Sequence, residues 1–254
     1  MESNRPALDQ ARVGLSRESV VPVAHSSDWL AQHMDSVSGI RSVARLLGGE
    51  SLVYRTDGRY AEASRSLLDE MSLGQAMTQG GMGIDVTMGW VVQKLALRDL
   101  QNLKDRLPSG SIVPMIKELE ALDRRRVSLD DVVANWSSWY RGSNNLGVRA
   151  MYRLSGIEKK ARTGEQSMAK PIRDQVERSF RFTLVDFAIH AFHQDRNAWP
   201  LSLDDLVPEY LASVPIDSGT GRSIDYPRNQ SGELTDDLSA IARPDGAVAS
   251  GPPR

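Results

Sequence analysis

The sequence predicts a mainly α fold: an antiparallel, repeat-like array of helical hairpins, a long C-terminal helix, then a short helix and a small β-hairpin. Two observations predict this class. Apolar residues recur every three or four residues along most of the chain between residues 36 and 193, which is the period of a helix face. Glycine-containing breaks divide this pattern into segments of helical length, which is typical of antiparallel helices joined by short turns.

Composition narrows the possible functions. The chain of 254 residues is 40% hydrophobic and 25% charged, which is ordinary for a folded protein with a sizeable core. Its net charge of −2 gives no general attraction to nucleic acid, so we expect no nucleic-acid partner. The absence of cysteine excludes disulfides, thiolate metal sites and a cysteine nucleophile. No window has the ~18 apolar residues of a membrane span, so we expect a soluble chain, either cytoplasmic or associated with the cell envelope.

The N-terminal half is interpreted as an arm followed by a helical-hairpin region. Residues 1–27 mix proline, serine and charge with little helical periodicity, which predicts an extended or partly ordered arm. In the hairpin region, residues 28–141, the first helix ends at Asp57-Gly58 because glycine accepts the left-handed conformation that closes a helix. The pair Gly48-Gly49 inside that helix favours a kink or a close contact with another helix.

Four further helices are expected in the hairpin region. They are expected over about 60–79 and 84–107, around 115–122, and from Ser128, where Ser128 and Asp131 form a capping-box-like start. The inward face of the helix at 84–107 is expected to consist of Met88, Val92, Ala96, Leu100, Leu103 and Leu107. The glycine-rich turn at 80–83 lacks the Gly-Lys-Ser/Thr of a phosphate loop, so we interpret it as a connection between helices.

The remainder of the chain divides into a loop and a second helical unit. Residues 142–170 carry four glycines and few periodic apolar positions, which predicts a linker or loop. A long helix follows over about 171–193, and its two adjoining apolar stripes require burial on most sides. We expect this helix and the tail that completes residues 171–254 to pack on the hairpin region.

The special residues of the tail have backbone roles. Asn197 tolerates a positive φ and can end the long helix. Ser202 and Asp205 form a second capping-box-like start, and residues 223–226 with 234–241 are the expected β-hairpin. The tail is expected to dock onto the helical body through its large apolar side chains, Trp199, Leu203, Leu206, Tyr210 and Leu211.

The tail also carries a residue pattern that resembles a known family. The signature residues are Asn197, Trp199, Pro200, Ser202, Leu203, Leu206, Pro208, Tyr210, Leu211, Pro215 and Asp217. This pattern is similar to the segment that follows the long helix of the G-type pseudopilins of type II secretion. Together with a Gly58-Arg59-x-x-Glu62-Ala63 turn, the arrangement resembles planctomycete-type helical proteins. The resemblance implies a protein partner in an envelope or secretion-like assembly, and relatives of this type often carry an N-terminal membrane anchor.

One stretch of the long helix offers candidate chemistry. Asp186, His190 and His193 are spaced four and three residues apart, so they can share a helix face and offer metal ligands. The simpler interpretation is a polar rim on an otherwise buried helix, because no HExxH-type motif is present. No serine-nucleophile motif occurs either. We therefore assign no catalytic, metal or cofactor-binding residue and expect no cofactor.

Two functional hypotheses follow from these observations. The preferred one is a non-enzymatic helical scaffold, or protein-interaction module, that binds a protein partner. The alternative is a metal-dependent enzyme or hydrolase centred on the face of the long helix that carries His190 and His193.

Overall fold

The computed structural model confirms a mainly α protein. It describes residues 4–22, 24, 28–142, 157–217, 220–224 and 226, with the side chains at 30, 129, 133, 136, 140 and 157–171 left undescribed. Within this part of the chain no β-strand is present, and Ile216 and Ser223 form an isolated antiparallel bridge. The second arm of the expected β-hairpin, residues 234–241, lies outside the described residues.

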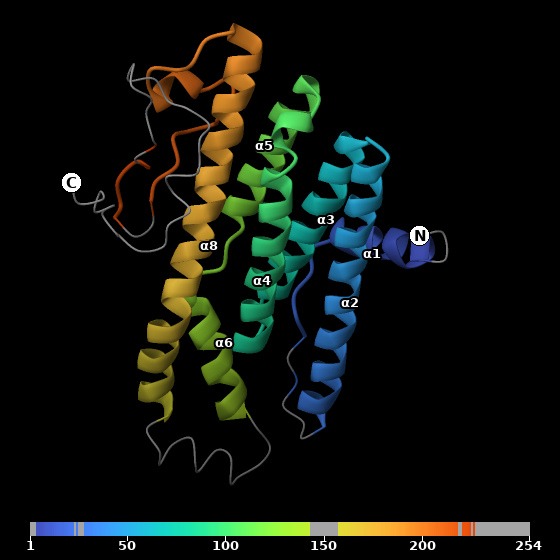
Figure 1. Cartoon of the computed structure of the whole chain (residues 1–254). Helices are drawn as coiled ribbons and strands as arrows, with labels where there is room; N and C mark the ends of the chain where they lie inside the picture. The colour runs from blue at the N-terminus through green and yellow to red at the C-terminus, as the bar shows by residue number, and fades with distance from the viewer. Residues whose placement is uncertain are drawn as a thin grey trace, which may run out of the picture.

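Helices account for most of the described chain (Figure 1). The α-helices are α1 (Arg5–Leu15), α2 (Trp29–Thr56), α3 (Tyr60–Thr78), α4 (Gly83–Gln101), α5 (Ser109–Arg124), α6 (Leu129–Gly142) and α8 (Ile157–Arg196). Two short 3-10 helices are η2 (Lys104–Arg106) and η3 (Leu203–Leu206). None of the described helices is long and apolar enough to cross a membrane.

The turn between α2 and α3 follows the local sequence. Gly58 has a φ of 73°, the left-handed conformation expected of the Asp57-Gly58 stop. The amide of Arg59 donates to the carbonyl of Tyr54, which closes the end of α2. Successive helices α2, α3 and α4 therefore run side by side in alternating directions (Figure 1). The helix α2 continues without a break through Gly48, whose missing side chain leaves room for the Glu70 carboxylate of α3.

The main hydrophobic core lies between α3, α4, α5, α8 and the tail. Its largest fully buried side chains include Leu67, Met71, Leu100, Ile112, Ile116, Leu119, Phe180, Phe187 and Tyr210. A smaller cluster joins α4, α6 and α8 through Val86, Trp90, Val132 and Val176. Figure 1 shows α8 along one side of the molecule and α2 along the other, with α4 between them.

The tail docks onto this core as expected. Asn197 has a φ of 49° and ends α8 one residue after Arg196, and its amide still donates to the carbonyl of His193. Asp205 accepts the amide of Ser202 at 2.8 Å in a capping box that begins η3. The side chains of Leu206, Tyr210 and Leu211 are fully buried in the main core, with Trp199 and Leu203 packed partly buried against it.

The N-terminal segment differs from the expected extended arm. Residues 5–15 form α1, which packs across α2 and α3. Leu8 is buried there, and the guanidinium of Arg12 pairs with Glu50 of α2 and, at 2.7 Å, with Asp69 of α3. The helix escaped prediction because one leucine and one arginine hold it, and both act through residues distant in sequence.

The long helix also begins earlier than expected. α8 starts at Ile157, whereas the sequence interpretation placed residues 142–170 in a linker and began the helix at Pro171. Residues 157–170 are rich in Glu, Lys, Ala, Gln and Met, which favour helix, and these outweigh Gly164. Residues 143–156 of the expected linker lie outside the described residues. The helix expected over 84–107 is shorter than predicted, because α4 ends at Gln101 and η2 follows.

Candidate functional site

The carboxylate of Asp186 is hydrogen-bonded inside the core. Its side chain is buried, and Oδ1 accepts from the Lys104 ammonium at 2.9 Å and from the Tyr226 hydroxyl at 3.1 Å. Lys104 belongs to η2 and Tyr226 to the tail, so this carboxylate ties α8 to both. The contacts assign Asp186 a structural role, since a buried charge requires a partner.

The two histidines near the end of α8 have separate surroundings. His190 is buried, and its Nε2 lies 2.9 Å from the side-chain nitrogen of Gln194. His193 stacks face to face on Trp199, with ring centroids 3.8 Å apart and an interplanar angle of 2°. Its Nδ1 is buried and has no hydrogen-bond partner among the residues that the structure describes. His193 is half-buried and lies between the helix and Trp199 of the tail.

The structure does not gather these candidates into a metal centre. Across the described residues, no three His, Asp or Glu side chains are grouped so that they could hold a metal ion. Asp186 forms an ion pair with Lys104, and the ring of His193 stacks on Trp199.

The signature residues of the tail occupy structural positions. Pro200, Leu206, Tyr210 and Leu211 are buried; Trp199, Ser202, Leu203, Pro215 and Asp217 are half-buried; Asn197 and Pro208 are exposed. Asp217 pairs with Arg178 of α8 at 3.4 Å, and its amide donates to the carbonyl of Arg222. The signature residues therefore hold the tail against α8.

A surface that the sequence analysis did not single out runs along α4. Ile84, Val91 and Leu95 are 40%, 43% and 44% exposed, and Met88 between them is half-buried. Their spacing of four, three and four residues puts them on one helix face. Single exposed apolar residues are ordinary on a protein surface, whereas several on one helix face make that face a candidate interaction site.

The neighbouring helix α2 extends this surface. His33 of α2 contacts Asp85 of α4, and Val37 of α2 packs in one cluster with Val92 of α4, so the two helices lie at matching levels. The exposed Met34 therefore lies at the level of Ile84. Further along α2, Leu52 is also exposed.

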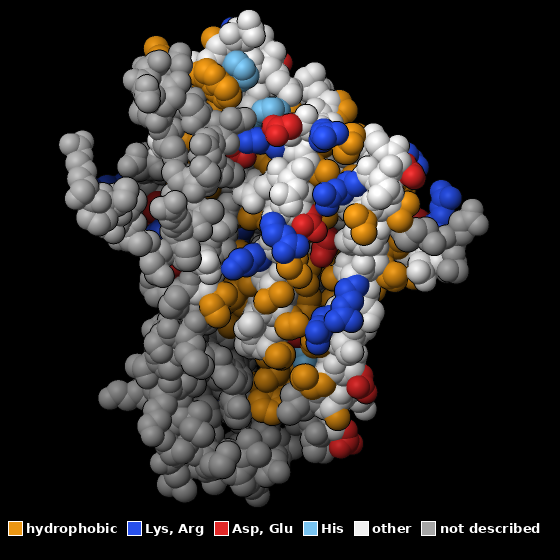
Figure 2. Space-filling view, in the orientation of Figure 1, with side chains coloured by type: hydrophobic (Ala, Val, Ile, Leu, Met, Phe, Trp, Pro, Cys, Tyr) orange, Lys and Arg blue, Asp and Glu red, His pale blue; other side chains and the backbone are white. Residues whose placement is uncertain are grey.

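Cations flank the apolar stripe. Arg41 and Arg45 follow Val37 by four and eight residues, along the edge of α2 that faces α4. On α4, the exposed Lys94 and Arg98 lie beyond the stripe. Figure 2 shows orange side chains running down the middle of this view with blue side chains on either side. We name this surface the α2–α4 face: Met34, Arg41 and Arg45 of α2, and Ile84, Met88, Val91, Lys94, Leu95 and Arg98 of α4.

A buried acid lies between the two helices behind this face. Glu70 of α3 faces Gly48 of α2, where a Cβ would lie 3.2 Å from the Glu70 Oε2 atom. Burial raises the pKa of the Glu70 carboxyl to about 7, and the negative charge of Asp99 on α4 adds to the increase. Asp99 itself pairs with Arg98 at 3.1 Å. Near neutral pH Glu70 is therefore partly protonated and adds less than one full negative charge behind the face.

The sequence contained a signal for this face. Ile84, Val91 and Leu95 repeat at helical spacing beside the inward stripe of Val92, Ala96 and Leu100, so α4 is apolar on more of its circumference than one buried face requires. Periodicity alone does not tell which stripe the rest of the protein covers.

Comparison of the chain with protein-family models, curated proteins and solved structures found no match.

Proposed function

We propose that this protein is a helical scaffold whose α2–α4 face binds an acidic amphipathic helix of a partner protein. The observation that carries the proposal is the continuous exposed stripe of Ile84, Val91 and Leu95 between two sets of cations. A helix laid in an apolar groove is a common mode of recognition, and its anchors repeat at helical spacing as this stripe does.

Charge decides the kind of partner. Arg41 and Arg45 line one edge of the stripe, and Lys94 and Arg98 lie at the other. A partner helix with apolar anchors and acidic flanks would match both features, whereas a basic helix would place like charges together. Because these cations are exposed, their contribution would weaken as salt screens them.

The support under the face favours a preformed site. Among the described helices, α3 packs most extensively, against α4 on one side and α2 on the other, and so supports both helices of the face. At the crossing of α3 and α4, Gly74 and Gly89 let the two backbones approach closely. A surface held in its binding conformation loses less entropy when a partner docks.

The proposed scaffold is a repeat-like array of helical hairpins that ends with α8 and its tail. The pseudopilin-like tail covers the array on the α8 side, and the partner binds on the other side, where α2 lies. A place in an envelope or secretion-like assembly rests on the sequence resemblance of the tail alone.

A selection experiment tests the proposal. A displayed library of amphipathic helical peptides, with the flanking positions randomised among acidic, basic and neutral residues, is selected on the immobilised full chain. We expect the enriched peptides to carry an apolar stripe with Asp and Glu flanks. Their binding should weaken at high salt and be lost with Val91→Asp.

The matched control is Val53→Asp. Val53 is another exposed valine, on α2, outside the α2–α4 face. Enrichment of basic or neutral flanks, or equal loss of binding with Val91→Asp and Val53→Asp, would contradict the proposal.

A further inference from the structure

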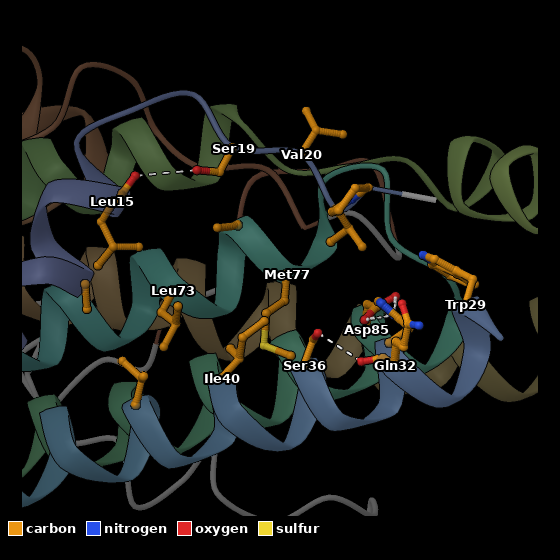
Figure 3. A pocket seen from close by; sticks show the side chains of 17 residues that line it. Leu15, Ser19, Val20, Trp29, Gln32, Ser36, Ile40, Leu73, Met77 and Asp85 are labelled. Carbon is orange, nitrogen blue, oxygen red and sulfur yellow. Dashed lines mark hydrogen bonds and ion pairs between the residues drawn. The ribbon is translucent and has the colours of Figure 1, made fainter. Parts of the chain in front are cut away.

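A cavity of about 450 Å³ lies beside α2, where the N-terminal segment covers it. Its walls come from α1, α2, α3, the start of α4 and the segment at 16–22. Figure 3 shows the apolar side chains of Leu15, Ile40, Leu73 and Met77 at one end of it. This volume falls in the range of small-molecule sites, which are largely apolar with a few polar groups.

The other end of the cavity is polar. His33 and Asp85 line it, and Nε2 of His33 lies 2.8 and 2.9 Å from the two carboxylate oxygens of Asp85. Both side chains are nearly fully buried. Asp85 also accepts the amide of Met82 at 2.8 Å, which caps the start of α4.

This pairing determines which nitrogen a ligand can reach. A carboxylate only accepts hydrogen bonds, so Nε2 of His33 carries the proton that points to Asp85. In the neutral imidazole Nδ1 then presents a lone pair, and no hydrogen bond from Nδ1 to another described residue is present. Trp29 stacks on the imidazole, with centroids 4.4 Å apart, and holds its orientation.

The segment at 16–22 closes one side of the cavity. The amide of Val21 donates to the carbonyl of Gln79 at 2.8 Å. Gly80, at a φ of 68°, leaves room for the Val20 side chain, because a Cβ on Gly80 would lie 2.5 Å from a Val20 methyl carbon. The glycine turn thus allows the segment at 16–22 to pack close enough to form one wall of the cavity.

From this geometry we infer that the cavity is a binding site for a neutral aliphatic alcohol. The hydrocarbon chain fills the apolar end, and the hydroxyl donates to Nδ1 of His33. The carboxylate of Asp85 disfavours an anionic head group at that end, because two negative charges would share a desolvated site. Ser36, the hydroxyl nearest to His33 along α2, donates to the carbonyl of Gln32 at 3.0 Å. Ser19, the other serine that lines the cavity, donates to the carbonyl of Arg17 at 3.4 Å, so both hydroxyls are hydrogen-bonded to the backbone.

Three ligands of equal chain length separate the contribution of the hydroxyl hydrogen bond from those of the hydrocarbon chain and the head-group charge. Octanol, heptyl methyl ether and octanoate are titrated into the full chain by calorimetry. The ether has the same heavy atoms as octanol but no donor, so it should bind about fivefold more weakly, the effect of one hydrogen bond. Octanoate should bind more weakly than octanol. Equal affinity for octanol and the ether, tighter binding of octanoate, or no binding of octanol would each overturn the inference.

Two variants locate the site. Ala76 and Ala61 are both half-buried on α3, and only Ala76 lines the cavity. We expect Ala76→Leu to weaken octanol binding at least tenfold by filling the cavity and Ala61→Leu to leave it unchanged. Octanol binding that survives Ala76→Leu would place the alcohol elsewhere and overturn the inference.

Discussion

Gly74 and Gly89 face each other where α3 crosses α4. A Cβ on Gly74 would lie 2.7 Å from the carbonyl oxygen of Gly89, and a Cβ on Gly89 would lie 2.4 Å from the carbonyl oxygen of Gly74. No side chain fits between the two backbones. Because α4 carries one half of the α2–α4 face and α3 supports it, this contact fixes the position of that half of the proposed binding surface.

Gly89→Ala is expected to destabilise the fold by about 1–3 kcal/mol, since the methyl group forces the helices apart. Gly39 is the matched control, because it lies inside α2 and an added Cβ would meet nothing within 4 Å. Gly39→Ala should stabilise by about 0.5–1 kcal/mol through helix propensity. Urea unfolding measures both changes. Similar effects of the two substitutions would show that the crossing is not tightly packed.

The buried ion pair of Lys104 and Asp186 gives a second prediction. Asp186→Asn removes the counter-charge of a buried ammonium, and this change should cost about 3–5 kcal/mol of unfolding free energy. The exposed pair of Arg98 and Asp99 is the comparison. Arg98→Gln should have no measurable effect on stability, because surface pairs contribute little. A neutral Asp186→Asn would mean that Lys104 reaches solvent.

Glu70 should make stability depend on pH. Its folded pKa of about 7 lies above the ordinary 4.5, so the folded state binds the proton more tightly than the unfolded chain. The stability from this group is fully present below about pH 4.5 and is lost as the pH rises through about 7. Relative to Glu70→Gln, the wild type should lose roughly 3 kcal/mol over that interval.

Unfolding of both proteins at several pH values measures this difference, and other carboxylates cancel in the comparison. A wild type that gains stability relative to Glu70→Gln as the pH rises would contradict the raised pKa.

The docking of the tail can be tested with two leucines. Leu206 is 0% exposed and Leu201 is 67% exposed, and they are five residues apart. Leu206→Ala should cost about 2–5 kcal/mol through the cavity that it leaves. Leu201→Ala should change stability by less than about 0.5 kcal/mol. If proteolytic removal of the tail left the unfolding midpoint unchanged, the tail would be a separate module.

The sequence predicted the features that depend on local chemistry. Gly58 and Asn197 adopt the positive φ expected of them at helix ends. The amide of Asp131 donates to the hydroxyl oxygen of Ser128 at 3.1 Å, which is the expected cap. Such signals act within one turn of the chain, so a single sequence is enough to identify them.

The features that the sequence did not reveal depend on distant partners. Arg12 docks α1 through Glu50 and Asp69, and His33 meets Asp85 across more than fifty residues of chain. Polar contacts of this kind produce no periodic pattern in the sequence, so a single sequence does not reveal them.

The candidate face was missed for a different reason. α4 bears two apolar stripes, and only packing decides that Val92 is covered while Val91 is not.

The affinity of an acidic amphipathic helical peptide, chosen by selection on the wild type, for Leu95→Asp and Val53→Asp tests the central claim most directly. Both variants place a carboxylate at an exposed apolar position, but only Leu95 belongs to the α2–α4 face. The proposal predicts that Leu95→Asp weakens binding at least about tenfold, the effect of losing one anchor of the interface. It also predicts that Val53→Asp changes the affinity less than twofold. Equal affinities of the two variants would contradict the assignment of this face as the binding surface.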